Sequence, residues 1–247
     1  MTKSRNAAAK RKANGSVPRA VLVDLAAASR ILVDQGVFDA AGHVSMRHPG
    51  KHRHFLMSRS LAPQLVTAAD IMEFNLDCEA IDARGRNGFI ERYLHGEIYK
   101  QRPDVMAIAH SHSASVIPFG LTNSPMRATY HNAAFLAAGV PVFDIREKFG
   151  ASDIVISSAA KGAALATVLG DKPVALLRAH GMVVVAESLP VAVFRAIFTE
   201  VSARVQLQAS ALGGPIAALD PEEGRLADIV NVATVGRSWD LWKRRVT

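Results

Sequence analysis

Apolar residues recur at helical spacing in several stretches of this chain. The first stretch holds Val21, Leu25, Ala28 and Leu32. A helix is expected to begin at Pro18 and to end near Gly36, because proline suits a first helical turn and glycine a last one. Further helices are expected at residues 89–101, 159–169, 190–212 and 221–245, with a short helix or turn at 113–119.

Short apolar runs bounded by turn residues predict strands between these helices. The runs cover residues 54–57, 71–76, 105–110, 140–145, 154–157, 174–177 and 182–185. Strands that alternate with helices, without a linker or an internal repeat, indicate one α/β domain. We expect this domain to span residues 18–247.

The positive charge of the chain is concentrated at its amino end. The chain has 29 Lys and Arg against 22 Asp and Glu, a formal net charge of +7. The first 20 residues contain no acid and hold Lys3, Arg5, Lys10, Arg11, Lys12 and Arg19. The remaining 23 basic residues nearly balance the 22 acidic ones. We therefore interpret residues 1–17 as a disordered basic tail and expect no nucleic-acid partner.

Composition excludes two further classes of protein. The chain is 49% hydrophobic and 21% charged, which argues against a largely disordered protein. No apolar run approaches the roughly 20 residues that cross a bilayer, so no membrane association is expected. A single cysteine, Cys78, cannot form an internal disulfide. This is typical of a reducing compartment, and we expect the protein to be cytoplasmic.

Nine histidines carry the clearest chemical signal. Those at residues 43–54 are interpreted as a polar surface loop. His110 and His112 end an apolar strand, where positions i and i+2 share a face, and His180 follows the strand at 174–177. Three neutral imidazoles with an open position are typical of catalytic divalent-metal sites. The spacing alone is equally compatible with three unrelated histidines at strand ends.

Glu91 and His95 form a second pair with possible chemistry. They lie four residues apart on one predicted helix and are expected to share a face. That helix leads through Pro103 into the strand that carries His110. A carboxylate near a metal ion can act as a general acid or base. Without further information, an ordinary pair on a helix surface is the simpler interpretation.

Taken together, these segments resemble the class II aldolase/adducin family over about residues 20–210. The matching motifs, in chain order, are Gly42-His43-Val44-Ser45-Met46-Arg47, Glu91-x-x-x-His95, Tyr99 through Arg102-Pro103-Asp104, Ala107-Ile108-Ala109-His110-Ser111-His112 and Ala175-Leu176-Leu177-Arg178-Ala179-His180-Gly181.

The resemblance implies a fold, a metal and an assembly. The implied fold is a three-layer α/β/α sandwich with a mostly antiparallel central sheet, assembled as a homotetramer. The implied metal ligands are His110, His112 and His180, holding one divalent ion per subunit: Mn²⁺, Zn²⁺, Fe²⁺ or Co²⁺. Glu91 is the implied catalytic carboxylate, which in some members of the family also contacts the metal.

Departures from the family pattern bear on the substrate. Sugar-phosphate members hold the phosphate with a Thr-Pro-Ser/Thr-Gly loop and with hydroxyl residues before the glutamate. This chain has Ser58-Arg59-Ser60-Leu61 and Gly88-Phe89-Ile90 instead. His43 stands where the family usually has Asn, and Asn132 stands near the position of a proton-donating tyrosine. A guanidinium suits a planar carboxylate, so the candidate substrate-binding residues are His43, Ser58, Arg59, Ser60 and His131.

The altered pattern resembles the family branch of dihydroxyphthalate and hydroxy-methylpyridine-dicarboxylate decarboxylases. The expected function is a metal-dependent decarboxylase of a hydroxylated aromatic carboxylate, with an enolate-type intermediate protonated by Glu91. Three alternatives remain: a class II aldolase acting on a hydroxy-carbonyl substrate, an iron oxygenase with the same histidines, and a non-catalytic adducin-like interaction module.

The family forms its site at a subunit boundary, which suggests residues that line or cover it. The candidates are Phe119, Tyr130, His131, Trp239 and Trp242. For the two tryptophans, which share one face of the last predicted helix, packing in the core is the favoured alternative.

Overall fold

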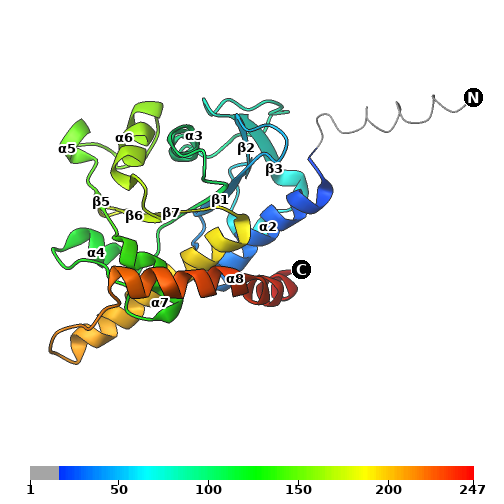
Figure 1. Cartoon of the computed structure of the whole chain (residues 1–247). Coiled ribbons are helices and arrows are strands. Elements are labelled where there is room, and N and C mark those ends of the chain that lie inside the picture. Colours follow the sequence, from blue (N-terminus) through cyan, green and yellow to red (C-terminus); the bar gives the residue numbers. More distant parts are fainter. Residues whose placement is uncertain (1–16) are drawn as a thin grey trace, which may run out of the picture.

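A seven-stranded sheet forms the centre of the computed structural model, which describes residues 17–247 (Figure 1). The strands are β1 (His43–Arg47), β2 (His54–Ser58), β3 (Ile71–Asn75), β4 (Ala107–Ser111), β5 (Val142–Phe143), β6 (Val174–Leu177) and β7 (Gly181–Ala186). Their order in the sheet is β3-β2-β1-β4-β7-β6-β5. Every neighbouring pair is antiparallel except β5 and β6, which are parallel.

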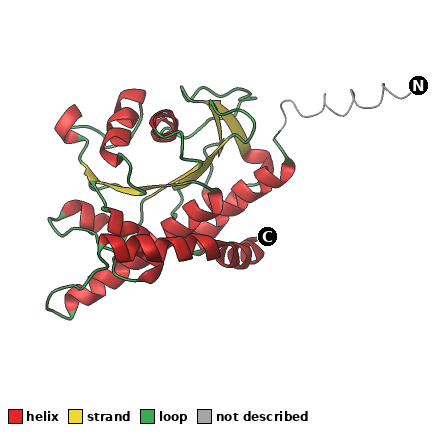
Figure 2. Cartoon of the chain, viewed as in Figure 1, coloured by secondary structure: helices red, strands yellow, loops and turns green. Residues whose placement is uncertain are grey.

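Helices cover both faces of this sheet (Figure 2). One face carries α3 (Arg92–Gln101), α5 (Arg146–Phe149) and α6 (Ala159–Leu169). The other face carries α2 (Arg19–Asp34), α4 (Ile117–Leu121), α7 (Leu189–Ala211) and α8 (Pro221–Val246), together with the 3₁₀ segment η4 (His131–Ala138). Two short 3₁₀ segments, η2 (Pro63–Leu65) and η3 (Ala68–Asp70), precede β3. The expected three-layer sandwich with a mostly antiparallel sheet is confirmed.

The central strands are apolar on both faces because each face packs against a helical layer. In β4, Ala107 and Ala109 belong to the core that α2, α7 and α8 cover, whereas Ile108 belongs to the core under α3 and α6. Side chains alternate between the two faces of a strand. His110 therefore follows Ile108 on the α3 side, which is also the side from which Glu91 approaches.

Several predicted boundaries differ from the structure. The helix expected at 89–101 begins only at Arg92, because residues 89–91 form a turn. Residues 154–157, expected as a strand, have no regular secondary structure. Only Val142–Phe143 of the run at 140–145 pairs with the sheet. Local apolar content does not reveal these limits, since pairing depends on a partner strand that is distant in sequence.

Strand β1 was missed because its histidines were interpreted as a surface loop. That interpretation is wrong for His43 and His48, which are only 2% and 3% exposed. His43 pairs with His110 across β1 and β4. Only His52, of the four histidines in residues 43–54, is exposed.

The aromatic residues considered for covering the site lie mainly in the core. Trp239 and Trp242 are 8% and 7% exposed and belong to the apolar cluster that includes Phe119 and Phe194. The favoured interpretation of the tryptophans as core residues is confirmed. Within the part of the chain that the structure describes, no helix is both long and apolar enough to cross a membrane. The expected basic tail, residues 1–17, lies outside the described residues except for Val17.

Candidate metal centre and the adjoining cavity

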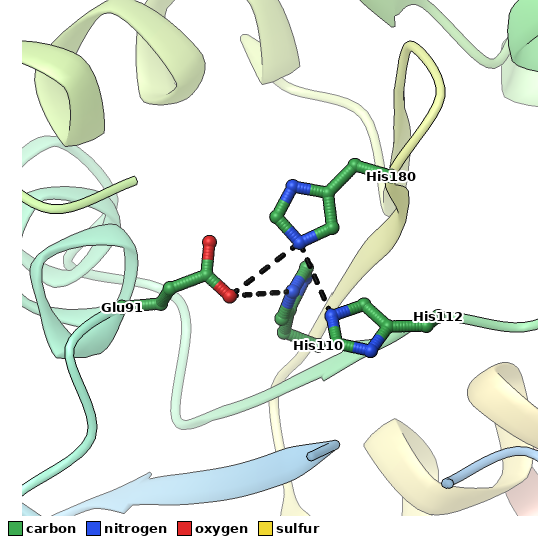
Figure 3. A group of neighbouring side chains, drawn as sticks. All are labelled: Glu91, His110, His112 and His180. Atoms are coloured by element: carbon green, nitrogen blue, oxygen red, sulfur yellow. Dashed lines mark hydrogen bonds and ion pairs between the residues drawn. The ribbon is translucent and has the colours of Figure 1, made fainter. Parts of the chain in front are cut away.

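Four side chains converge near the end of the central strand β4 (Figure 3). His110 lies in β4 and His112 directly after it, His180 lies in the turn between β6 and β7, and Glu91 immediately precedes α3. One nitrogen or oxygen from each residue lies within 4.8 Å of the corresponding atoms of the others. The residues grouped by the sequence motifs are thus brought together, although Glu91 and His180 are far apart in the chain.

The β6–β7 turn brings His180 close to the end of β4. A Cβ atom on Gly181 would lie only 1.9 Å from the carbonyl oxygen of Ser111, so no other residue fits this approach. Ala179, just before the histidine, has a φ of +55°, in the left-handed region. The close contact and the tight turn together place the His180 ring over the end of β4.

Each of the three histidines has one ring nitrogen oriented by an oxygen acceptor. Nδ1 of His110 donates to the carbonyl of Met182 at 3.0 Å, and Nδ1 of His180 donates to the carbonyl of Ile154 at 3.0 Å. A carbonyl oxygen only accepts, so the hydrogen of each ring must be on Nδ1.

His112 has the same arrangement with a carboxylate as the acceptor. Its Nδ1 lies 3.0 Å from Oδ2 of Asp39, which was not singled out in the sequence because no motif surrounds it. A ligating histidine in proteins typically donates its other ring N–H to a carbonyl or a carboxylate. In all three rings the Nε2 lone pair is therefore directed toward the centre of the group.

These lone pairs face one another at distances that suit a bound cation. Nε2 of His112 and Nε2 of His180 are 3.1 Å apart, yet both hydrogens are already on Nδ1. Nε2 of the fully buried His110 has no hydrogen-bond partner, since Glu91 Oε2, although 3.2 Å away, lacks hydrogen-bond geometry. Three imidazole lone pairs and one carboxylate fit a divalent ion such as Zn²⁺, Mn²⁺, Fe²⁺ or Co²⁺.

Glu91 is held in its carboxylate form. Its Oε1 accepts the main-chain N–H of Ile156 at 2.9 Å, and its Oε2 lies 3.5 Å from Nε2 of His180. Burial alone would raise the pKa of Glu91, but the adjacent His110 and His180 outweigh burial and lower the pKa well below its usual range. Glu91 is consequently unprotonated at neutral pH in the free protein.

Glu91 also borders a cavity of about 650 Å³. Its walls include His43, Ser60, Leu61, Phe89, Ile90 and Glu91. This volume lies within the range of roughly 300–1,000 Å³ typical of small-molecule sites. The apolar walls with a few polar groups suit a flat ring that carries polar substituents.

The other predicted substrate-binding residues are distributed differently. Ser60 lies in the cavity wall, whereas Ser58 is buried at the end of β2. Nε of Arg59 donates to Oδ1 of Asp70 at 2.6 Å, and its side chain is 39% exposed. His131 is exposed at the start of η4 and lies outside the cavity wall of its own chain.

Glu91 lies in the turn directly before α3 and His95 lies within that helix, and both side chains are buried rather than on the surface. Nε2 of His95 lies 2.8 Å from Nδ1 of His43. Its Nδ1 lies 2.7 Å from Oγ of Ser45. The prediction that both residues form one surface pair is thus wrong.

Comparisons with known proteins agree with the motifs. Residues 23–207 match the family described as class II aldolase and adducin N-terminal domain. The chain is 35% identical over 239 residues to the decarboxylase tropJ of Talaromyces stipitatus, covering 87% of this chain and 90% of that protein. It is 29% identical to a 3,4-dihydroxyphthalate decarboxylase of Arthrobacter keyseri, covering 87% and 89%.

A solved structure extends the likeness to the fold. An L-fuculose 1-phosphate aldolase from Glaciozyma antarctica superposes with a TM-score of 0.74 at 25% identity, covering 97% of this chain and 95% of that one. The resemblance that the sequence motifs indicated, to the family and to its decarboxylases, is confirmed.

Proposed function

Because this chain belongs to the class II aldolase and adducin family and is a carbon–carbon lyase, we propose that it is a metal-dependent decarboxylase. The proposed substrate is an aromatic carboxylate with a hydroxyl group ortho to the departing carboxylate. One observation carries the proposal: Glu91 belongs both to the group of converging ligands and to the wall of the cavity. Glu91 thus joins the candidate metal ligands to a cavity with room for an aromatic ring.

In the proposal His110, His112 and His180 hold one divalent ion, and Glu91 lies beside it. A bound divalent cation would act as a Lewis acid that stabilises negative charge on the substrate's hydroxyl oxygen. The hydrogen bonds to Met182 and Ile154 keep the histidine rings in the orientation that this role requires.

Glu91 would move one proton twice in each cycle. Glu91 is a carboxylate in the free protein and first accepts the proton of the substrate's hydroxyl group. It then delivers that proton to the ring carbon that bears the carboxylate. The C–C bond breaks, CO₂ leaves, and the bonding electron pair returns through the ring to the hydroxyl oxygen. A solvent proton restores the product's hydroxyl group.

Arg59 is the proposed anchor for a carboxylate of the substrate. Asp70 engages its Nε, while its two terminal nitrogens have no hydrogen-bond partner among residues 17–247. An anchor that contacts substrate and transition state equally affects binding alone. We therefore expect Arg59→Ala to raise KM with little change in kcat, and steady-state CO₂ release at varied substrate concentration measures both.

The second candidate function is that of an aldolase on a hydroxy-carbonyl substrate. The fold likeness to an L-fuculose 1-phosphate aldolase favours it. Against it stand the arginine of the Ser58-Arg59-Ser60 segment and the 35% identity to a protein named a decarboxylase. An iron oxygenase and an adducin-like interaction module rest on weaker matches: a relative named an oxygenase/synthase, 29% identical over 60% of this chain, and a beta-adducin, 24% identical over 80% of it.

The deciding experiment offers metal-loaded enzyme both kinds of substrate. The expected result is CO₂ release from 3,4-dihydroxyphthalate, or from another aromatic acid with an ortho hydroxyl group, and no cleavage of hydroxy-carbonyl sugars. Cleavage of the sugars without CO₂ release from any such acid would replace the decarboxylase with the aldolase.

We also propose a homotetramer in which His131 reaches the site of a neighbouring subunit. Support comes from apolar side chains of α8 that are more than half exposed: Leu226, Ile229, Val230 and Leu241. Such side chains are typical of a protein–protein interface. Light scattering tests the assembly, and a stable, fully active monomer would contradict it.

A further inference from the structure

A chain of buried hydrogen bonds leads from the cavity into the protein beneath α3. It begins where Nδ1 of His43 meets Nε2 of His95 at 2.8 Å. It continues from Nδ1 of His95 to Oγ of Ser45 at 2.7 Å. It ends at the hydroxyl of Tyr99, 2.9 Å from Oγ of Ser45. None of the four residues is more than 2% exposed.

The hydrogens available to this chain can be counted. Ser45 and Tyr99 each contribute one hydroxyl hydrogen, and burial raises the pKa of Tyr99, so its hydrogen stays on the oxygen. Within residues 17–247, Ser45 is the only hydrogen-bond partner of the Tyr99 hydroxyl. Burial lowers the pKa of His95 to about 3, so this ring is neutral and carries a single N–H.

Only one direction of donation gives every hydrogen inside the buried chain an acceptor and leaves the one remaining N–H, on His43, at the cavity. In that direction Tyr99 donates to Ser45, and Ser45 donates to Nδ1 of His95. In the opposite direction Nδ1 of His95 donates to Ser45, and one of the two hydroxyl hydrogens then has no acceptor. A buried donor without a partner is costly enough to disfavour that direction by about tenfold or more.

The favoured direction decides which nitrogen of His43 carries a hydrogen. His95 accepts at Nδ1, so its own hydrogen is on Nε2 and is donated to Nδ1 of His43. The single hydrogen of the neutral His43 ring is then on Nε2. His43 accepts at Nδ1, so its ring is neutral.

We propose that His43 presents an Nε2–H donor to the cavity and donates it to a carboxylate oxygen of the substrate. His43 lines the cavity together with Glu91, and Nε2 is the ring nitrogen that the buried chain leaves available. Ser45, His95 and Tyr99 are positioning residues that fix this tautomer. The identity of the acceptor as a carboxylate rests on the proposed function, whereas the tautomer does not.

Nitrogen NMR of histidine-labelled protein tests the tautomer directly. The sample is the Zn²⁺-loaded protein, which is diamagnetic, and the His43 signals are those absent from His43→Gln. We expect a protonated Nε2 and an unprotonated Nδ1. A hydrogen on Nδ1 would overturn the proposal.

Binding of a probe tests the donation. The probe is 3,4-dihydroxybenzoate, which keeps a carboxylate but has none ortho to a hydroxyl group and so does not react. We expect it to shift the Nε2–H signal of His43. A saturating probe that shifts other histidine signals but leaves this one unchanged would refute the donation.

Two variants test whether the hydroxyl groups fix the tautomer. Tyr99→Phe keeps the serine donor, so the hydrogen of His43 should stay on Nε2. The double variant Ser45→Ala/Tyr99→Phe removes both hydroxyl hydrogens, and a mixture of the two His43 tautomers is expected. An unchanged tautomer in the double variant would show that the buried chain does not control His43.

Kinetic measurements test the His43 donor, and their outcome can be distinguished from a failure of the proposed decarboxylation. His43→Gln keeps an N–H donor, whereas His43→Leu does not, and kcat/KM of the leucine variant should be lower by about 10- to 100-fold than that of the glutamine variant. Equal values would refute the role of the donor. If the wild-type enzyme releases no CO₂ while the NMR results are as expected, the proposed reaction fails and the fixed tautomer stands.

Discussion

Histidines gather at both ends of strand β1, but only one of the two groups brings ring lone pairs together. At the start of β1, next to His43, lies the triad of His110, His112 and His180. Beyond its end lies a second group, called here the Glu73 cluster, formed by His48, Lys51, His54 and Glu73. Both groups combine several imidazoles with one carboxylate.

The difference lies in the source of positive charge. In the Glu73 cluster, Lys51 Nζ lies 2.7 Å from Oε1 of Glu73, and Nδ1 of His54 contacts the same oxygen. Burial would raise the pKa of Glu73, but Lys51 and His54 outweigh it and lower the pKa. In contrast, the ion-pair partners of Glu91 among residues 17–247 are the histidines His110 and His180.

The tautomer of His48 also differs from those of the three triad histidines. Nδ1 of His48 accepts the main-chain N–H of Gly50 at 3.0 Å, so the hydrogen of that ring is on Nε2. In the triad the hydrogens are on Nδ1, and the Nε2 lone pairs face inward. Neighbouring histidines and a carboxylate therefore indicate a metal site only where lone pairs converge and no lysine or arginine supplies the charge.

Loss of one ligand from the triad is expected to have the largest effect. His112→Ala should abolish stoichiometric metal binding and activity, because it removes one of the three imidazole ligands that the proposal assigns to the metal. The matched control is His54→Ala in the Glu73 cluster, since both side chains are 25% exposed. Elemental analysis of purified protein and CO₂ release measure the two properties. Stoichiometric metal in His112→Ala would show that the triad is misassigned.

Substitutions of the two carboxylates, Glu91 and Glu73, should differ almost as strongly in their effect on kcat. Glu91→Gln removes the proton-transfer group but keeps three histidines, so it should retain the metal and lose roughly 10²–10⁴-fold in kcat. Glu73→Gln should leave kcat nearly unchanged and cost only about 1 kcal/mol or less of stability, the typical value of a partly exposed ion pair. Turnover and chemical denaturation distinguish the variants, and comparable losses of kcat in both would contradict the contrast.

A smaller effect is expected in the pH dependence of stability. The folded protein keeps His95 neutral down to a pKa of about 3, below the usual value of 6.5. Between these pH values the unfolded chain binds a proton that the folded chain does not, so stability is lost as the pH falls below about 6.5. His95→Gln removes this proton, and its slope should be shallower by up to about 1.4 kcal/mol per pH unit.

The pH experiment is done by urea unfolding with a chelator present, so that release of metal does not contribute. The wild-type protein under the same conditions is the reference. Identical slopes for the two proteins between pH 4 and pH 6 would mean that His95 is protonated in the folded state.

Removal of residues 1–16 is expected to have the smallest effect. The first 17 residues hold most of the charge excess and no apolar pattern that builds a core, and Val17 is the first residue that packs against the core. The melting temperature and turnover should stay nearly unchanged. A large decrease in the melting temperature or in turnover would show that folding or activity depends on the basic tail.

Much of the metal centre could be predicted from the sequence by itself. The spacing of His110 and His112 at the end of an apolar strand places both rings near each other, because successive strand residues alternate in direction. His180, which follows another apolar strand, and Glu91 were candidates from their positions in the sequence, and the motif resemblance assigned them to the same site as His110 and His112. These features are local, since each depends on residue type and on neighbours a few positions away.

Only the tertiary structure determined how the histidine rings are oriented, which of them are buried and where their hydrogens lie. The carbonyls of Met182 and Ile154, which orient two of the rings, belong to segments whose side chains carry no signal for that contact. The burial of His43 depends on its pairing with His110, which sequence periodicity does not encode. Hydrogen positions in a buried network are set by the partners that distant segments bring within about 3 Å, and that information exists only once the chain has folded.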